Sequence, residues 1–242
     1  MEMDTPPPRK SSVDQIRARF DNDVERFSNL DTGQAATIDA PLVLELIAAA
    51  AAATTPQARD VLDVGCGAGN YTLKLLQRLP GLNATLIDLS PRMLERAVSR
   101  IGPATRGTVT PLAGDVRDLP LAPESFDVVL AAAVLHHLRT DAEWESVFTK
   151  FYSCLRPGGS IWISDLVDHA APGTRAVMHD RYGQYLATLG GDEYRDKVFA
   201  YVDAEDSPKP LLFQTDLLSR VGFEQVEVLH KNNCFAAFGA VK

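Results

Sequence analysis

The stretch VLDVGCGAGNYT, Val61 to Thr72, decides the fold of this 242-residue chain. A short apolar run ends at Val64 and is followed by glycines at positions 65, 67 and 69. The run predicts a buried strand, and glycine lets the backbone bend sharply and approach a ligand without a side chain in the way. The pattern therefore predicts a strand, a tight nucleotide-binding bend and a helix.

Around this stretch, β-branched runs alternate with helical patterns. The predicted strands cover residues 60–64, 84–88, 108–113, 126–131 and 160–165. The predicted helices between them cover residues 70–79, 91–101 and 141–155, the last ended by the sequence RPGG. This alternation is typical of an α/β fold, a parallel sheet with helices on both faces, which binds ligands at the carboxyl ends of its strands.

Two helical patterns precede the alternation. Residues 11–27 have apolar side chains at helical spacing, and residues 41–53 form an alanine-rich run that starts with proline. Both predict helices, which we group as an N-terminal helical cap over residues 13–55. The apolar run is shorter than the roughly 20 residues that a membrane span needs, so we expect no membrane as a partner.

After the fifth predicted strand, the alternation of strand and helix patterns stops. Tyrosines, histidines and charged residues occur at helical spacing without a strand pattern, which predicts a helix over 169–202 within a lid insertion, 169–207. A helical pattern follows over 211–221. Two apolar runs, 224–230 and 234–241, then predict paired antiparallel strands.

Composition narrows the class of protein. The length favours one domain, over 13–242, after an acidic, proline-rich segment, 1–12, that predicts a disordered tail rather than a signal peptide. A net charge of -8 and a sequence pI of about 5.1 disfavour nucleic acid as a partner.

The three cysteines, Cys66, Cys154 and Cys234, lack the spacing of a zinc site, so we expect no metal. We expect their thiols to be buried in a cytoplasmic protein.

Three acidic residues indicate which nucleotide the bend binds. Asn70 stands where a dinucleotide fingerprint has its third glycine, which weakens the prediction of a pyrophosphate. Asp88 closes the second predicted strand, where a carboxylate accepts hydrogen bonds from ribose hydroxyls. Asp115, after the third strand, is placed to accept from an adenine amino group, and Asp63 adds negative charge beside the bend. Carboxylates suit a cationic adenosyl sulfonium, S-adenosylmethionine, better than a pyrophosphate.

Four segments carry a resemblance to a known family. They are VLDVGCGAGNYT, LIDLSPRMLERA, AGDVRDLPLAPESFDVVLAAAVLHHL and LRPGGSIWISD. Together they resemble the class I S-adenosylmethionine-dependent methyltransferases over residues 60–165. The resemblance implies a Rossmann-like, seven-stranded, mostly parallel sheet with an antiparallel last strand, and S-adenosylmethionine as the cofactor.

The resemblance also implies cofactor-binding roles. It places Asp63, Gly65, Cys66 and Gly67 around the methionine part, Asp88 and Leu89 on the ribose, Asp115 and Val116 on adenine, and Ala132 at the end of the fourth strand.

A weaker resemblance involves both ends of the chain. The segments FDNDVERF and FAAFGAVK look like the bacterial family that makes carboxy-S-adenosylmethionine for tRNA wobble-uridine modification. That family needs an arginine to hold the extra carboxylate, and Arg181 and Arg195 lie in the corresponding region. A tRNA-pathway enzyme is therefore the alternative function.

The acceptor side offers three catalytic candidates, His136, Asp165 and His169, which follow the fourth and fifth predicted strands. Methyl transfer depends on alignment and exclusion of water, and it needs a general base only when the acceptor keeps its proton. His137 adjoins His136, and helical geometry predicts that at most one of these rings faces the methyl group. For each of these residues, a structural role is the alternative to a catalytic one.

Three lid residues, His179, Tyr182 and Tyr185, recur at three-residue steps and so share a helical face. They line the acceptor pocket if this helix is the lid, and they are ordinary packing residues otherwise. Gln34, after Gly33, either closes over the cofactor or is an idle residue of a turn.

The sequence as a whole predicts a cytoplasmic S-adenosylmethionine-dependent methyltransferase that acts on a small-molecule acceptor. A protein that binds the cofactor without catalysis is a further alternative. The acceptor atom is left open, and a homodimer is one oligomeric state that the sequence allows.

Overall fold

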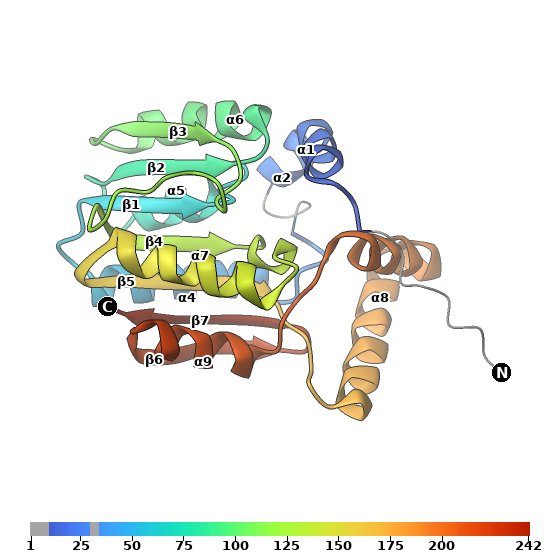
Figure 1. Ribbon diagram of the computed structural model, residues 1–242. Coiled ribbons are helices and arrows are strands. Elements are labelled where there is room, and N and C mark those ends of the chain that lie inside the picture. The colour runs from blue at the N-terminus through green and yellow to red at the C-terminus, as the bar shows by residue number, and fades with distance from the viewer. Residues whose placement is uncertain (1–9, 30–33) are drawn as a thin grey trace.

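The computed structural model describes residues 10–29 and 34–242, and in this part of the chain seven strands form one sheet (Figure 1). The strands are β1 Asp60–Val64, β2 Asn83–Asp88, β3 Val109–Ala113, β4 Phe126–Ala132, β5 Leu155–Leu166, β6 Glu224–Asn232 and β7 Phe235–Val241. Their order is β3-β2-β1-β4-β5-β7-β6, with β7 antiparallel to both neighbours and the other pairs parallel. The predicted α/β fold, with its antiparallel last strand, is confirmed.

Helices cover both faces of the sheet, as predicted (Figure 1). One face packs against α4 Ala40–Thr54, α5 Asn70–Leu76 and α6 Pro91–Ile101, and the other against α7 Asp141–Cys154 and α9 Leu211–Val221. The side chains of Trp144, Phe148 and Phe151 on α7 are fully buried against the sheet. Burial of such side chains stabilises the fold by about 1.5–3 kcal/mol each.

The N-terminal region forms two short helices, α1 Val13–Asn22 and α2 Val24–Ser28, where the sequence predicted one over 11–27. The break lies at Asp23, whose φ of -104° and ψ of 12° are not helical. The alanine-rich helix, α4, packs into the core of the sheet, so of the helices described before β1 only α1 and α2 lie outside that core. Residues 1–9 of the predicted tail lie outside the described residues.

The end of α7 lies next to the RPGG segment, as predicted, but this segment has a different structure from the one expected. The helix ends at Cys154, and the sequence RPGG does not cap it but lies inside β5. Leu155 pairs with Phe126 of β4, and the ladder resumes where Val128 pairs with Ser160, so residues 156–159 form an irregular bulge between these pairs. The predicted end of the helix, at residue 155, is therefore correct within one residue, and Leu155 belongs to β5 instead of the helix.

The predicted lid segment is α8 Pro172–Glu205, two helical halves joined at a break. The break lies at Gly190 and Gly191, where φ is -164° and 74°. The halves pack together, since the rings of His179 and Phe199 stack with centroids 4.0 Å apart. Figure 1 shows α1 and α8 on the side of the sheet toward which the parallel strands point.

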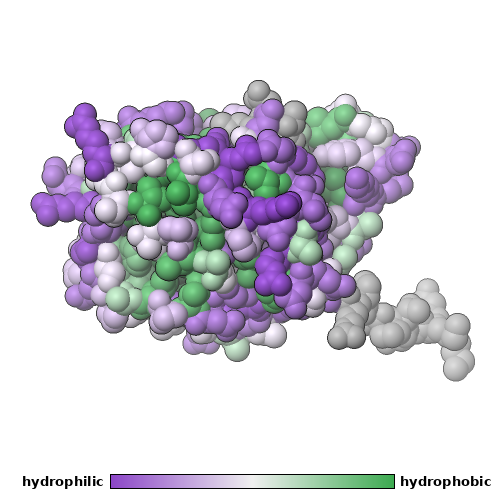
Figure 2. Space-filling model, turned by 90° about the horizontal axis from the view of Figure 1, so that it is seen from above, coloured by the Kyte–Doolittle hydropathy of each residue, from purple (hydrophilic) through white to green (hydrophobic). Residues whose placement is uncertain are grey.

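The surface of the molecule carries both polar and apolar side chains. Viewed from above, toward the β3 edge, apolar side chains gather in patches within a largely polar face (Figure 2). No helix within residues 10–29 and 34–242 combines the length and the hydropathy that crossing a membrane requires.

The start of α7 provides a test of local stability. The Thr140 hydroxyl accepts from the Glu143 N–H at 3.2 Å, and the Glu143 carboxylate accepts from the Thr140 N–H at 3.0 Å, which is a capping box. We expect Thr140→Ala to lower the free energy of unfolding by about 1 kcal/mol, as loss of an N-cap does. Urea denaturation measures this change in the free energy of unfolding. Thr174→Ala, at an exposed position on α8, is the control, and equal losses in both variants would contradict the capping role.

Candidate active site

The glycine bend begins where β1 ends. Gly65 and Gly67 have φ of +65° and +51°, a left-handed conformation that side chains rarely adopt. A Cβ on Gly65 would lie 2.6 Å from the Cβ of Val134, in the loop after β4. The bend is therefore packed directly against the β4 loop, at the carboxyl edge of the sheet.

The N–H groups of the bend are bonded within the protein. The N–H of Cys66 donates to the Ile87 carbonyl at 2.9 Å, and that of Gly67 to the Asp88 carboxylate at 2.8 Å. The N–H of Gly69 donates to the Cys66 carbonyl at 2.8 Å. Phosphate-binding loops offer such N–H groups to the ligand, so this arrangement does not favour a pyrophosphate.

Asp88 ends β2 and braces the bend. Its carboxylate accepts from the N–H groups of Gly67 and Ser90, both at 2.8 Å, and the residue is 9% exposed. Burial raises the pKa of Asp88 to about 6, although the two N–H groups act in the opposite direction. A buried carboxylate whose bonds come from backbone groups is suited to a ligand that supplies hydroxyl donors or positive charge.

Asp63 adds a second buried carboxylate behind the bend. It accepts from the Thr72 hydroxyl at 2.6 Å and is 1% exposed. Burial raises the pKa of Asp63 to about 6, and the charge of Asp88 acts in the same direction. The two carboxylates together make this edge of the sheet favourable for a cation.

Asp115 follows β3 and is held by an arginine that the sequence did not single out. Arg117 donates to the two Asp115 oxygens from Nε at 3.0 Å and from Nη2 at 2.6 Å, and it also contacts Glu143. Burial would raise the pKa of Asp115, but Arg117 outweighs it and the pKa is lowered. The Oδ2 atom accepts one side-chain bond and so has a lone pair for a further donor, such as an amino group.

A pocket joins these residues at the carboxyl edge. Its wall contains five residues that the sequence assigned to the cofactor: Gly65, Asp88, Leu89, Asp115 and Val116. The wall also contains residues that were not predicted as ligand contacts, among them Val13, Ile16, Val134, His137 and the two arginines Arg117 and Arg139. The other four assigned residues, Asp63, Cys66, Gly67 and Ala132, lie outside this wall.

The N-terminal helix α1 contributes Val13 and Ile16 to the pocket, and Ile16 is 4% exposed. A slot with apolar walls and carboxylates at its edge fits an adenosyl group: the walls would contact the base, Asp88 would accept from the ribose hydroxyls and Asp115 would accept from the amino group. The residues present therefore fit S-adenosylmethionine, with Asp63 and Asp88 supplying the negative charge that its sulfonium requires.

The two histidines after β4 lie on a short 3₁₀ turn, Leu135–His137. His136 Nδ1 is bonded to the carboxylate of Asp165, whose other oxygen accepts from the N–H groups of Leu135 and His136 at 2.7 and 3.2 Å. The structure thus brings together two of the predicted catalytic candidates, His136 and Asp165. Asp165 is 2% exposed and fixes the orientation of the imidazole.

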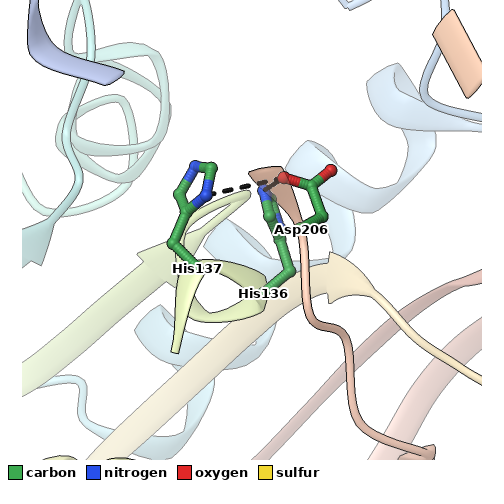
Figure 3. Close-up of side chains that lie close together, drawn as sticks. All are labelled: His136, His137 and Asp206. Atoms are coloured by element: carbon green, nitrogen blue, oxygen red, sulfur yellow. Dashed lines mark ion pairs between the residues drawn. The ribbon is translucent and has the colours of Figure 1, made fainter. Parts of the chain in front are cut away.

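The rings of His136 and His137 do not diverge as helical spacing predicted. Their centroids are 4.4 Å apart, and both rings face one carboxylate, that of Asp206 after α8 (Figure 3). Burial opposes the charged form of His136, but Asp165 and Asp206 outweigh it and raise its pKa to about 9.

The remaining predicted residues lie elsewhere. His169 Nε2 is 3.2 Å from Nζ of Lys231 on β6, so the structure does not bring His169 to His136 and Asp165. The hydroxyl groups of Tyr182 and Tyr185 donate to the carbonyls of Ala36 and Ala35 at 3.0 and 2.7 Å.

The three lid residues are thus engaged in packing. Tyr182 is 6% exposed, and the ring of His179 is stacked on Phe199. Gln34 accepts from the Thr37 N–H through its carbonyl, in a turn, and Gly33 lies outside the described residues. These contacts anchor α8 to the segment after Gly33.

Comparison with known proteins also indicates a methyltransferase. Residues 61–159 match the family model of a methyltransferase domain. An uncharacterized methyltransferase of Geobacillus kaustophilus is 36% identical over 136 residues, which cover 56% of this chain and 60% of that protein. A tRNA U34 carboxymethyltransferase of Azotobacter vinelandii is 35% identical over 131 residues, covering 52% of this chain and 38% of that protein. Both alignments span less than two thirds of the relative.

A solved structure extends the likeness to nearly the whole chain. The DhpI-SAH complex has a TM-score of 0.62 at 18% identity and covers 94% of this chain and 95% of that one, which shows the fold. The fold and the family match confirm the resemblance to the class I S-adenosylmethionine-dependent methyltransferases, with residues 61–159 matching a methyltransferase domain.

The raised pKa values of Asp63 and Asp88, both about 6, predict a pH-dependent affinity. Protonation neutralises these carboxylates as the pH falls through 6, and the cationic ligand favours the ionised form. We expect the affinity for S-adenosylmethionine to fall by about tenfold for each carboxylate between pH 7.5 and pH 5.

Calorimetric titration at both pH values measures this change, and adenosine, which lacks the sulfonium, is the control ligand. A fall of the same size for adenosine would show that the sulfonium charge does not interact with these carboxylates.

Proposed function

We propose that this chain transfers the methyl group of S-adenosylmethionine to a small-molecule acceptor. The observation that carries the proposal is the pocket at the carboxyl ends of β1 and β2, with Asp88 on its wall and α1 laid over it. Two buried carboxylates stand where a cationic cofactor needs them, and the N–H groups of Cys66, Gly67 and Gly69 are not free for a phosphate.

The residues around the pocket support methyl transfer in three ways. S-adenosylmethionine, when bound, supplies a methyl group on a positively charged sulfur. Asp88 and Asp115 hold and orient the adenosyl part, while Val13 and Ile16 of α1 exclude water from it. Asp165 fixes the ring of His136, and this pair is the candidate for orienting the acceptor.

The surroundings of the pocket support a small acceptor. The chain carries a net charge of -8, which repels a nucleic-acid backbone. The α1 cap is fastened to the end of α8: Arg19 pairs with Glu205, its guanidinium lies 4.2 Å from the ring centroid of Tyr201, and the Ser11 N–H donates to the Ala204 carbonyl at 3.0 Å. A pocket that α1 partly covers suits a molecule small enough to enter it whole.

The test is an assay of S-adenosylhomocysteine release with thiols, phenols, amines and carboxylic acids as acceptors. We expect turnover with at least one of these classes. Binding of the cofactor without turnover on any of them, together with methylation of a bulk RNA or protein fraction, would contradict the small-molecule proposal.

The alternative is a tRNA-pathway enzyme that makes or uses carboxy-S-adenosylmethionine, and the carboxymethyltransferase relative fits this weaker resemblance. It needs an arginine beside the methyl position. Arg195 is engaged by Asp192 and Asp196 at 2.7 and 2.8 Å, and neither it nor Arg181 lies on the pocket wall. Mass spectrometry of the ligand that copurifies with the protein separates the two functions, because the alternative requires an added carboxylate.

A further inference from the structure

Three side chains converge beside the cofactor pocket without bonding to one another. Asp206 Oδ1 lies 3.6 Å from His136 Nε2 and 3.5 Å from His137 Nδ1, both beyond hydrogen-bond distance (Figure 3). Asp206 is 5% exposed, and its Oδ1 atom and both ring nitrogens of His137 have no hydrogen-bond partner in the described part of the chain. Buried polar atoms are nearly always paired, so this cluster lacks a partner at its centre.

The spacing of the three atoms fits a metal ion. Zinc binds nitrogen and oxygen at about 2.0–2.2 Å, which puts tetrahedral ligands roughly 3.4 Å apart. Both distances to Asp206 Oδ1 are close to this value, and all three atoms lie within 4.8 Å of one another. Two imidazoles and one carboxylate are also a donor set typical of zinc and of ferrous iron.

The surroundings of His136 have the form expected around a ligand. Its Nδ1 is bonded to Asp165, which leaves Nε2 directed at Asp206. A carboxylate on the far nitrogen of a histidine orients the ring for metal binding and makes the ligand more basic. The cysteine spacing indicated no metal, whereas this set of ligands joins the turn after β4 to the chain after α8.

We propose that His136 Nε2, His137 Nδ1 and Asp206 Oδ1 form a binding site for one divalent transition-metal ion, zinc or ferrous iron. Three protein ligands leave a coordination position open, as in catalytic sites. His137 also lines the cofactor pocket, so the open position suits an oxygen of the acceptor. That last role rests on the proposed function, whereas metal binding by itself does not.

The experiment titrates the metal-stripped full-length chain with Zn²⁺ by calorimetry and with Co²⁺ by visible absorption, without cofactor or acceptor. We expect one ion per chain and a Co²⁺ spectrum of low-coordinate nitrogen and oxygen ligation. His137→Gln and Asp206→Asn should each weaken binding by at least about a hundredfold, since each removes one of three ligands. His169→Gln, which alters a histidine near Lys231, should leave it unchanged.

Circular dichroism of each variant establishes that it is folded, and two ligand variants are used so that misfolding of one does not decide the result. Absence of stoichiometric binding to the wild-type chain, or equal affinities in the ligand variants and in His169→Gln, would overturn the proposal. Either result would leave the methyltransferase proposal standing, since the readout involves neither cofactor nor turnover.

Discussion

Replacing Asp88 by alanine is expected to weaken the binding of S-adenosylmethionine by about a hundredfold, the effect of removing a buried charged hydrogen-bond acceptor. Two effects combine in this variant. The ribose loses its acceptor, and the N–H groups of Gly67 and Ser90, which Asp88 holds at 2.8 Å, lose theirs. The bend then binds the ligand with less preorganisation, so the affinity falls further.

Calorimetry with the purified variant measures the loss, and Asp88→Asn separates the two effects because an amide oxygen still accepts one bond. Asp216→Ala removes an exposed carboxylate on α9 and serves as the control for net charge. Wild-type affinity in Asp88→Ala would show that the ribose assignment is wrong.

Replacing Gly65 by alanine is expected to lower the free energy of unfolding by about 3 kcal/mol and to abolish tight cofactor binding. A Cβ at this position has to adopt φ of +65° and would lie 2.6 Å from Cβ of Val134. Gly67→Ala is the matched control: its φ is +51°, but nothing lies within 4 Å of an added Cβ, so the loss should be only about 1 kcal/mol from backbone strain.

Urea denaturation of the two variants measures the difference. The double variant Gly65→Ala with Val134→Gly removes the Cβ that the new methyl group would meet, so it should be more stable than the sum of the two single changes predicts. Additive losses would show that the bend does not depend on its contact with the β4 loop.

The sheet could be predicted from the sequence because local patterns specify it. Residues 60–64 form β1 as predicted, because three apolar residues, Val61, Leu62 and Val64, lie directly before a glycine bend. The order of motifs also placed Asp88 and Asp115 at strand ends, and the structure puts both on the pocket wall. Strand ends are reliable sites for prediction because parallel strands bring them to one edge.

The features that escaped prediction depend on contacts between distant parts of the chain. Asp206 meets His136 and His137 only because α8 folds back at Gly190 and returns the chain to the β4 loop. Val13 and Ile16 showed helical spacing, but nothing local indicated that α1 would lie over the pocket. The break of the N-terminal helix at Asp23 likewise has no marker in the sequence, since no proline or glycine is there.

The central claim is that carboxylates beside a glycine bend make a binding site for a cationic adenosyl ligand. The most direct measurement is calorimetric titration of the full-length chain at pH 7.5 with S-adenosylmethionine, NADH and ATP in parallel. We predict one site that binds S-adenosylmethionine with micromolar or better affinity and no measurable heat from the other two ligands. Saturable binding of NADH or ATP with no binding of S-adenosylmethionine would contradict the claim.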